Sequence, residues 1–246
     1  MFGAYQAGVW TVLERVIRPD LVIGCSVGSI NGWSIAAGVS GDELVRTWLD
    51  ARCATLMRAR RRWLPGRSLF DPAPLSEMVQ QMTATYTPQV PFALAVTRVP
   101  RLRLHLFQSP EITWRHIVAS CAVPVAFPSV RIGAQSYCDG GLLSTLPVWA
   151  APQLGADRVI AVNALPRMPI NLLRAGVRTL RFITPKPPKT NGLEIIEIAP
   201  PGALGTVQEA LTWNPATIER WIEHGRADAR AAIDSAKFAA MLGRFV

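Results

Sequence analysis

A Gly-x-Ser-x-Gly turn places the tightest limits on how this chain folds. The apolar run 21–23 leads into Gly24-Cys25-Ser26-Val27-Gly28, and an alanine-containing helical segment follows. This order predicts a strand, a sharp turn and a helix, with the Ser26 hydroxyl exposed at the edge of a sheet. Side chains at Gly24 and Gly28 are expected to crowd the turn. The N-terminus of the helix then faces Ser26, where its field favours a developing negative charge.

A second short motif, Asp139-Gly140-Gly141, follows a predicted strand at residues 136–139. An aspartate before two glycines lies on an open turn, which is one way to present a carboxylate base to another residue. The same pattern is typical of an ordinary turn between a strand and a helix. Taken alone, the motif favours the ordinary turn.

The motifs gain meaning from their order along the chain. The run Ser120-Cys121-Ala122-Val123-Pro124-Val125-Ala126-Phe127-Pro128 precedes Asp139-Gly140-Gly141, and Leu146-Pro147-Val148 follows it. Together with the Gly-x-Ser-x-Gly turn, these segments resemble the patatin-like phospholipase family, which carries the same motifs in this order. Residues 4–9 are also similar to the first helix of that family. The resemblance covers nearly the whole chain.

The resemblance implies a catalytic dyad with Ser26 as the nucleophile and Asp139 as the base that accepts its proton. Such a dyad forms an acyl-enzyme with an ester of a lipid, and the same aspartate then activates water. The implied activity is that of a serine lipid acyl hydrolase, meaning a phospholipase, lysophospholipase or esterase. The expected partner is a lipid or acyl-ester substrate, and the scheme requires no metal or other cofactor.

The chain departs from the family at the oxyanion hole, which the family builds from a Gly-Gly-Gly-x-Arg/Lys-Gly loop. Gly3 is the one remnant of that loop, with Phe2 in place of the basic residue and Met1 at the free position. The loss of one oxyanion donor typically lowers the rate by roughly 100- to 1000-fold. We therefore expect an N-terminally incomplete domain that lacks the family's glycine-rich strand and loop and whose activity is weak in this form.

Two other functions are compatible with the sequence. A non-catalytic lipid- or membrane-binding protein of the same family is expected if the missing loop abolishes turnover. An esterase of the α/β-hydrolase type is suggested by the chain order Ser26, Asp139, His224. Against this triad, His224 falls in a helical segment among charged residues, and only about one strand precedes Ser26.

The net charge of +9 and the pI near 10.2 favour an anionic partner. Nucleic acid is not expected, because the chain has no zinc-finger spacing and no aromatic RNA-binding signature. A basic run that ends in an aromatic residue is typical either of a solvated loop or of peripheral contact with anionic membranes. Its residues are Arg58, Arg60, Arg61, Arg62 and Trp63.

The cysteine spacing and the lack of a targeting pattern indicate the compartment of the protein. The four cysteines have no metal-binding or disulfide spacing and are expected to be reduced and buried. The N-terminus shows no signal-peptide pattern, and no apolar run is long enough to span a membrane. A cytoplasmic protein, peripheral at the membrane if the basic run docks there, is expected.

Strands alternate with helices along most of the chain, which predicts one α/β domain over residues 1–246 with a mostly parallel sheet flanked by helices. Strands are predicted at 21–25, 92–99, 103–108, 136–139, 158–164 and 193–199. Helices are predicted at 4–16, 29–39, 42–57, 74–86, 113–121, 146–153 and 171–180. A long C-terminal helix is expected over about residues 214–242, with Asn214-Pro215 at its start.

Overall fold

A mixed β-sheet in the computed structural model brings the two predicted motifs to one point. The model describes residues 1–60, 68–166, 184–188, 190 and 192–243. The strands of the larger sheet are β1 (Val22–Cys25), β2 (Phe92–Val99), β3 (Arg103–Gln108), β4 (Val130–Ile132) and β5 (Gln135–Asp139). The order is β1-β2-β5-β4, with β3 also paired to β2.

Strand β2 has two neighbours that share one of its edges. β1 runs parallel to β2 and ends with Cys25 opposite Ala95. β5 runs antiparallel to β2 and ends with Asp139 opposite Val96. Because Ala95 and Val96 are consecutive, the C-terminal ends of β1 and β5 meet in the middle of β2. This register brings residues 26 and 139 together although more than a hundred residues separate them in sequence.

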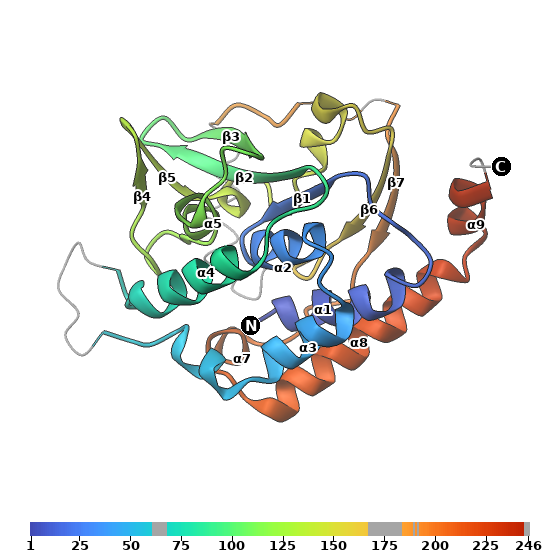
Figure 1. The fold of residues 1–246 in the computed structure, drawn as a ribbon, viewed down its shortest axis with the longest axis horizontal. Coiled ribbons are helices and arrows are strands. Elements are labelled where there is room, and N and C mark those ends of the chain that lie inside the picture. The colour runs from blue at the N-terminus through green and yellow to red at the C-terminus, as the bar shows by residue number, and fades with distance from the viewer. Residues whose placement is uncertain (61–67, 167–183, 189, 191, 244–246) are drawn as a thin grey trace.

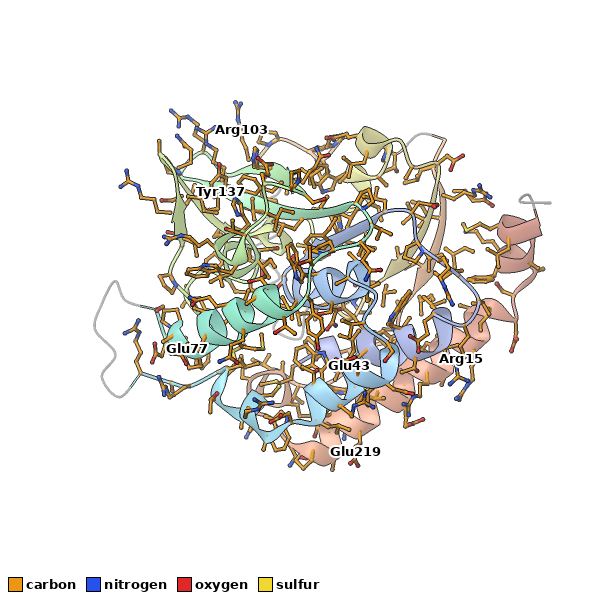
Figure 2. All side chains as sticks on the ribbon, in the orientation of Figure 1. Arg15, Glu43, Glu77, Arg103, Tyr137 and Glu219 are labelled. Atoms are coloured by element: carbon orange, nitrogen blue, oxygen red, sulfur yellow. The ribbon has the colours of Figure 1, made fainter. Side chains whose placement is uncertain are left out.

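Helices flank the sheet and build two apolar cores (Figure 1). Their bounds are α1 (Gly3–Leu13), α2 (Val27–Ala36), α3 (Gly41–Leu49), α4 (Ala73–Thr85), α5 (Trp114–Ser120), α7 (Val207–Leu211), α8 (Pro215–Ile233) and α9 (Ala236–Leu242). The first core joins α1, α3 and α8 around Tyr5 and Trp221. The second joins α2, α4 and α5 to β2 around Phe92 and Ile117. Charged side chains such as those of Glu77, Arg103 and Glu219 project outward (Figure 2).

A second, two-stranded parallel sheet is formed by β6 (Arg158–Val162) and β7 (Glu194–Ile198). Within the described part of the chain, β1 pairs only with β2 and β6 only with β7. A cavity of about 800 Å³ lies between these two sheets, lined by residues from β1 and from β6. The α/β class with helices flanking the sheet is confirmed. The sheet is mixed, with parallel pairs at β1–β2 and β6–β7.

Three helix predictions need correction. The helix expected over about 214–242 is two helices, because the chain turns after Asp234 and the Ser235 hydroxyl accepts the Phe238 N–H at 3.2 Å to start α9. The helix expected at 146–153 is wrong: 3-10 turns at Val148–Ala150 and Pro152–Leu154 occur there, because Pro152 lacks the N–H that a helix needs. The helix expected at 42–57 ends at Leu49. The helix expected at 171–180 lies outside the described residues.

Candidate active site

Ser26 lies between β1 and α2 in a backbone conformation that side-chain-bearing residues rarely adopt. Its φ is 54° and its ψ is −133°. Such a geometry is strained by about 1–3 kcal/mol and persists only where surrounding contacts enforce it. The Ser29 N–H donates to the Ser26 carbonyl at 2.8 Å, and the Cys121 thiol approaches the same oxygen at 3.2 Å. The predicted strand–turn–helix arrangement around Ser26 is therefore present.

The hydroxyl of Ser120 holds the elbow in place. Its Oγ accepts the Ser26 N–H at 3.0 Å and donates to the Ala95 carbonyl of β2 at 2.8 Å. The Ser29 hydroxyl lies 2.8 Å from Ser120 Oγ. Ser120 is fully buried, so these are its hydrogen-bond partners in the described structure. The sequence singled out Ser120 only as part of a motif, and its bracing role was not predicted.

Asp139 ends β5 and is 3% exposed. Its Oδ1 accepts the Gly141 N–H at 2.6 Å. Among the described residues, Oδ2 is buried and has no hydrogen-bond partner of regular geometry. The Ser26 hydroxyl is nevertheless close enough to the carboxyl group to lower its pKa. Burial raises the pKa of Asp139 from 3.8 to about 6, and the contacts with Ser26 and Gly141 oppose that rise. The structure thus places a desolvated carboxyl group, more basic than usual, beside Ser26.

The glycines of the two motifs differ in what they do. A Cβ at Gly24 would lie 2.5 Å from the Ser29 Cα, and a Cβ at Gly140 would lie 2.6 Å from the Ala95 carbonyl oxygen. Both positions therefore require glycine for close backbone approach. At Gly141 the nearest atom would be Asp139 Oδ1, at 2.9 Å. At Gly28 the nearest atom would belong to the Gln6 side chain, at 3.4 Å, so the crowding expected there is absent.

The cavity between the two sheets adjoins this site. Cys25 and Gly28, on either side of Ser26, line it, as do apolar side chains from α1, β1 and β6. Its volume of about 800 Å³ is within the range of small-molecule sites. The first N–H groups of α2, those of Val27 and Gly28, precede the hydrogen-bond ladder of that helix. An anion that develops at Ser26 therefore meets a helix N-terminus.

Gly3, the remnant of the expected oxyanion loop, has a packing position in the structure. It is buried in the first turn of α1, and a Cβ there would lie 2.2 Å from the Trp48 ring. Its carbonyl accepts a hydrogen bond from the Asn31 amide at 2.9 Å, and the Trp48 indole donates to Asn31 at 2.9 Å. This buried network joins α1, α2 and α3, and the sequence did not indicate it.

The histidines do not complete a triad with the dyad residues. His224 is exposed on α8, whose buried face carries Trp221 and Ile222 and packs on α1. His116 caps α5, where its Nδ1 accepts the Thr113 N–H at 3.0 Å. His105 lies on β3, where its ring meets the Phe107 ring edge-on and lies at a tilt to the Tyr137 ring. The geometry gives no support to the interpretation with His224 as the base.

The basic run is only partly described. Arg58 forms an ion pair with Asp71 at 2.5 Å, and the Arg60 N–H donates to the Leu69 carbonyl at 3.0 Å. Arg61, Arg62 and Trp63 lie outside the described residues. The expected contact of this run with anionic membranes remains a prediction.

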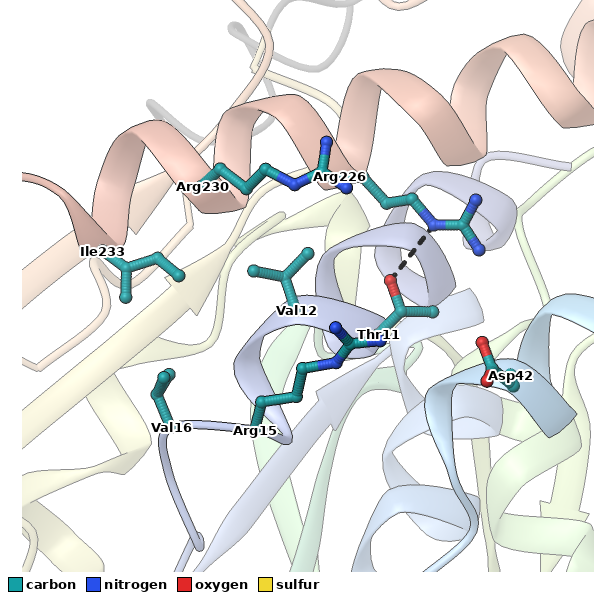
Figure 3. Close-up of a pocket in the computed structure, with 8 residues that line it drawn as sticks. All are labelled: Thr11, Val12, Arg15, Val16, Asp42, Arg226, Arg230 and Ile233. Atoms are coloured by element: carbon teal, nitrogen blue, oxygen red, sulfur yellow. Dashed lines mark hydrogen bonds between the residues drawn. The ribbon is translucent and has the colours of Figure 1, made fainter.

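A smaller cavity of about 380 Å³ lies between α1 and α8 (Figure 3). Arg15, Arg226 and Arg230 line it, and Arg226 Nε donates to the Thr11 hydroxyl at 3.2 Å. Arg15 follows the C-terminus of α1 and Arg230 lies in the last turn of α8, where positive charge is favourable. The lining contains no nucleophile beside a base, so we assign the candidate active site to the elbow.

Other features bear on the predicted chemistry. All four cysteines are buried and none is joined in a disulfide, as expected. Burial raises the pKa of Cys121 well above its usual value, and the nearby Asp139 contributes. The described residues include no cluster of three or more potential metal ligands. Within the same residues, no helix combines the length and apolarity that a membrane crossing requires.

A family model and a solved structure match this chain. The family model described as patatin-like phospholipase matches residues 1–152, which include both motifs. Among solved structures, the chain is similar to VipD from Legionella pneumophila at 16% identity and a TM-score of 0.35. That match covers 94% of this chain and 52% of VipD, so the chain spans about half the length of VipD. Comparison with curated proteins finds no match. The chain belongs to the patatin-like phospholipase family.

Proposed function

We propose that this protein is a serine lipid acyl hydrolase in which Ser26 is the nucleophile and Asp139 is its base. The observation that carries the proposal is the meeting of β1 and β5 on consecutive residues of β2, which puts a buried carboxyl group beside the Ser26 hydroxyl. Family membership supports an ester of a lipid as the substrate class.

The chemistry follows from the two side chains. Ser26 Oγ attacks the ester carbonyl while Asp139 takes the hydroxyl proton, which forms a tetrahedral oxyanion. The N–H groups of Val27 and Gly28 are the donors that the first turn of α2 offers to that anion. Asp139 then gives its proton to the leaving alcohol, and the acyl group remains on Ser26.

Deacylation uses the same carboxylate. Asp139 takes a proton from water as the water attacks the acyl-enzyme, and the proton returns to Ser26 as the fatty acid leaves. A pKa of about 6 suits this role, because the carboxyl group is ionised near neutral pH yet more basic than an exposed aspartate. The cavity beside Cys25 and Gly28, which is lined in part by apolar side chains, gives room for the acyl part of a substrate.

A fluorophosphonate probe tests the nucleophile directly. We expect labelling of the wild-type chain at Ser26, no labelling of Ser26→Ala, and hydrolysis of a soluble short-chain ester that follows the labelling. Ser34→Ala is the control. Ser34 is buried in α2, the helix that follows Ser26, and its hydroxyl makes one long hydrogen bond, 3.4 Å, to the Ile30 carbonyl. Absence of labelling in folded wild-type protein would overturn the proposal and favour a non-catalytic lipid-binding protein.

A further inference from the structure

An exposed apolar cluster includes two residues of the loop that follows α5. Four large hydrophobic side chains are exposed among the described residues. Three of them, Leu69 (42%), Val123 (43%) and Val125 (72%), come together, because the Leu69 N–H donates to the Val125 carbonyl at 2.9 Å. We call these three residues the apolar tip. The fourth, Val16 (43%), lies at the cavity between α1 and α8.

The apolar tip is connected directly to the dyad. The Asp139 N–H donates to the Ala122 carbonyl at 3.0 Å, one residue before Val123. One residue earlier, the Cys121 thiol contacts the Ser26 carbonyl. The loop that carries Val123 and Val125 joins α5 to β4 (Figure 1), and it begins at the residue whose thiol contacts the Ser26 carbonyl.

The backbone of Val125 supports a functional interpretation of its exposure. Its φ is 72°, which is an outlier for a β-branched residue. Glycine or asparagine would adopt this conformation with less strain. The Phe127 N–H donates to the Val123 carbonyl at 2.8 Å, and the Phe70 N–H donates to the Ala126 carbonyl at 3.0 Å, so the loop is held in place. The fold thus presents an apolar side chain to solvent in a strained position, three residues after Ala122, whose carbonyl accepts the Asp139 N–H.

We propose that the apolar tip inserts into the surface of an anionic lipid bilayer and so brings the Ser26 site to its substrate. The proposal rests on the proposed lipid hydrolase function. Exposed apolar groups with basic neighbours favour such a surface. Arg60 lies across from Leu69, to whose carbonyl its N–H donates, and the chain carries a net charge of +9. An anionic bilayer complements both properties.

Co-sedimentation with vesicles tests this inference on the full chain. Vesicles of phosphatidylcholine and phosphatidylglycerol are compared with vesicles of phosphatidylcholine alone. We expect Val125→Asn to weaken binding to the anionic vesicles by roughly five- to tenfold, because most of an inserted apolar side chain is lost. Val16→Asn is the matched control, an equally conservative change at another exposed valine, and should bind within about twofold of wild type.

Asparagine is chosen because it tolerates a positive φ, so the substitution is not expected to unfold the protein. Hydrolysis of a soluble short-chain ester should be the same in Val125→Asn and wild type, whereas hydrolysis of vesicle lipid should fall with binding. Equal vesicle binding by Val125→Asn and wild type would overturn the inference. A dimer in solution that Val125→Asn converts to monomer would also overturn it, because the tip would then cover a second copy of the chain.

The two proposals fail in distinguishable ways. Ser26→Ala should keep wild-type binding to vesicles, because the tip does not depend on the hydroxyl. Loss of vesicle binding in Val125→Asn with no ester hydrolysis in wild type would support the surface and reject the hydrolase. Ester hydrolysis by wild type, together with equal vesicle binding by Val125→Asn and wild type, would support the hydrolase and reject the role of the apolar tip in membrane binding.

Discussion

Ser26 and Val125 both have a positive φ, but the chain supports them differently. Ser26 is held by the buried Ser120 hydroxyl and by the start of α2. Val125 is held by backbone hydrogen bonds at the surface, and its side chain is 72% exposed. Strain at the first residue positions a reactive group against a base. Strain at the second orients an apolar side chain toward solvent, where nothing in the folded chain uses it.

The difference separates two requirements of a lipid hydrolase. The elbow needs an interior polar network, because the nucleophile and its base must keep a fixed geometry. A surface that meets a bilayer needs only exposure and apolar area. We therefore expect changes at the elbow to affect chemistry on every substrate, and changes at the apolar tip to affect only lipid in bilayers.

The largest expected effect comes from Asp139→Asn. Loss of the base should lower hydrolysis of a soluble ester by roughly 1000-fold or more. The variant should not be less stable, because Asn can still accept the Gly141 N–H. At neutral pH it should gain up to about 3 kcal/mol of unfolding free energy, since the pKa of Asp139 rises from 3.8 to about 6 and each pKa unit corresponds to about 1.4 kcal/mol.

Steady-state kinetics and urea unfolding measure the two effects of Asp139→Asn. The control is Asp234→Asn, because Asp234 is exposed at the C-terminal end of α8, a helix that packs on α1 and α3. Wild-type activity in Asp139→Asn would remove this residue from the mechanism.

Ser120→Ala should have the second-largest effect on activity. It removes the acceptor of the Ser26 N–H and the donor to the Ala95 carbonyl. Unsatisfied buried groups cost about 1–3 kcal/mol each, so stability should fall by that order. Activity on a soluble ester should fall by roughly 10- to 100-fold because the elbow loses its brace.

The outcome for Ser120→Ala is measured by kcat/KM and thermal unfolding. Rescue by Ser120→Thr, which keeps a hydroxyl, would show that the hydrogen bonds matter rather than the volume. An unchanged kcat in a folded Ser120→Ala protein contradicts a bracing role.

Activity should depend on pH through Asp139. The base must be ionised, so kcat/KM on a soluble ester should fall about tenfold per pH unit below about 6. Stability responds with the opposite sign. Because the folded pKa is raised, the native state binds this proton more tightly than the unfolded chain does between 3.8 and about 6. The contribution of Asp139 to stability is therefore greatest below that window and is lost as the pH rises through about 6.

A pH–rate profile and unfolding curves check this dependence. The stability advantage of Asp139→Asn over wild type should shrink as the pH falls from neutral toward 3.8. A profile flat through pH 6 would assign the limiting ionisation to another group.

The smallest expected effect is that of a change at Val125 on the free energy of unfolding of the protein. Val125→Gly relieves the strain of the positive φ, but it also raises the conformational entropy of the unfolded chain. The two contributions oppose each other, so the free energy of unfolding should change by no more than about 1 kcal/mol. Ser26→Gly relieves similar strain yet should abolish ester hydrolysis. Thermal unfolding of both variants shows whether the strain at the two residues is comparable. A loss of several kcal/mol in Val125→Gly would mean that the side chain packs in the fold.

Local signals predicted the parts of this protein that depend on short segments. The strand–turn–helix around Ser26 follows from glycines and β-branched residues, and strands β2 and β3 follow from two apolar runs. Helix ends were less predictable. The break between α8 and α9 depends on Ser235, whose preference for a helix start competes with an otherwise continuous helical pattern.

The amino-acid sequence by itself determined the family, the strand–turn–helix at Ser26 and the presence of an aspartate followed by two glycines. Only the tertiary structure decided that β1 and β5 end on adjacent residues of β2, that Ser120 braces the elbow and that Asp139 is buried enough to change its pKa. Turns and strands follow from backbone preferences of neighbouring residues. Register, burial and desolvation depend on segments distant in sequence, so they emerge only when the sheet and its helices pack together.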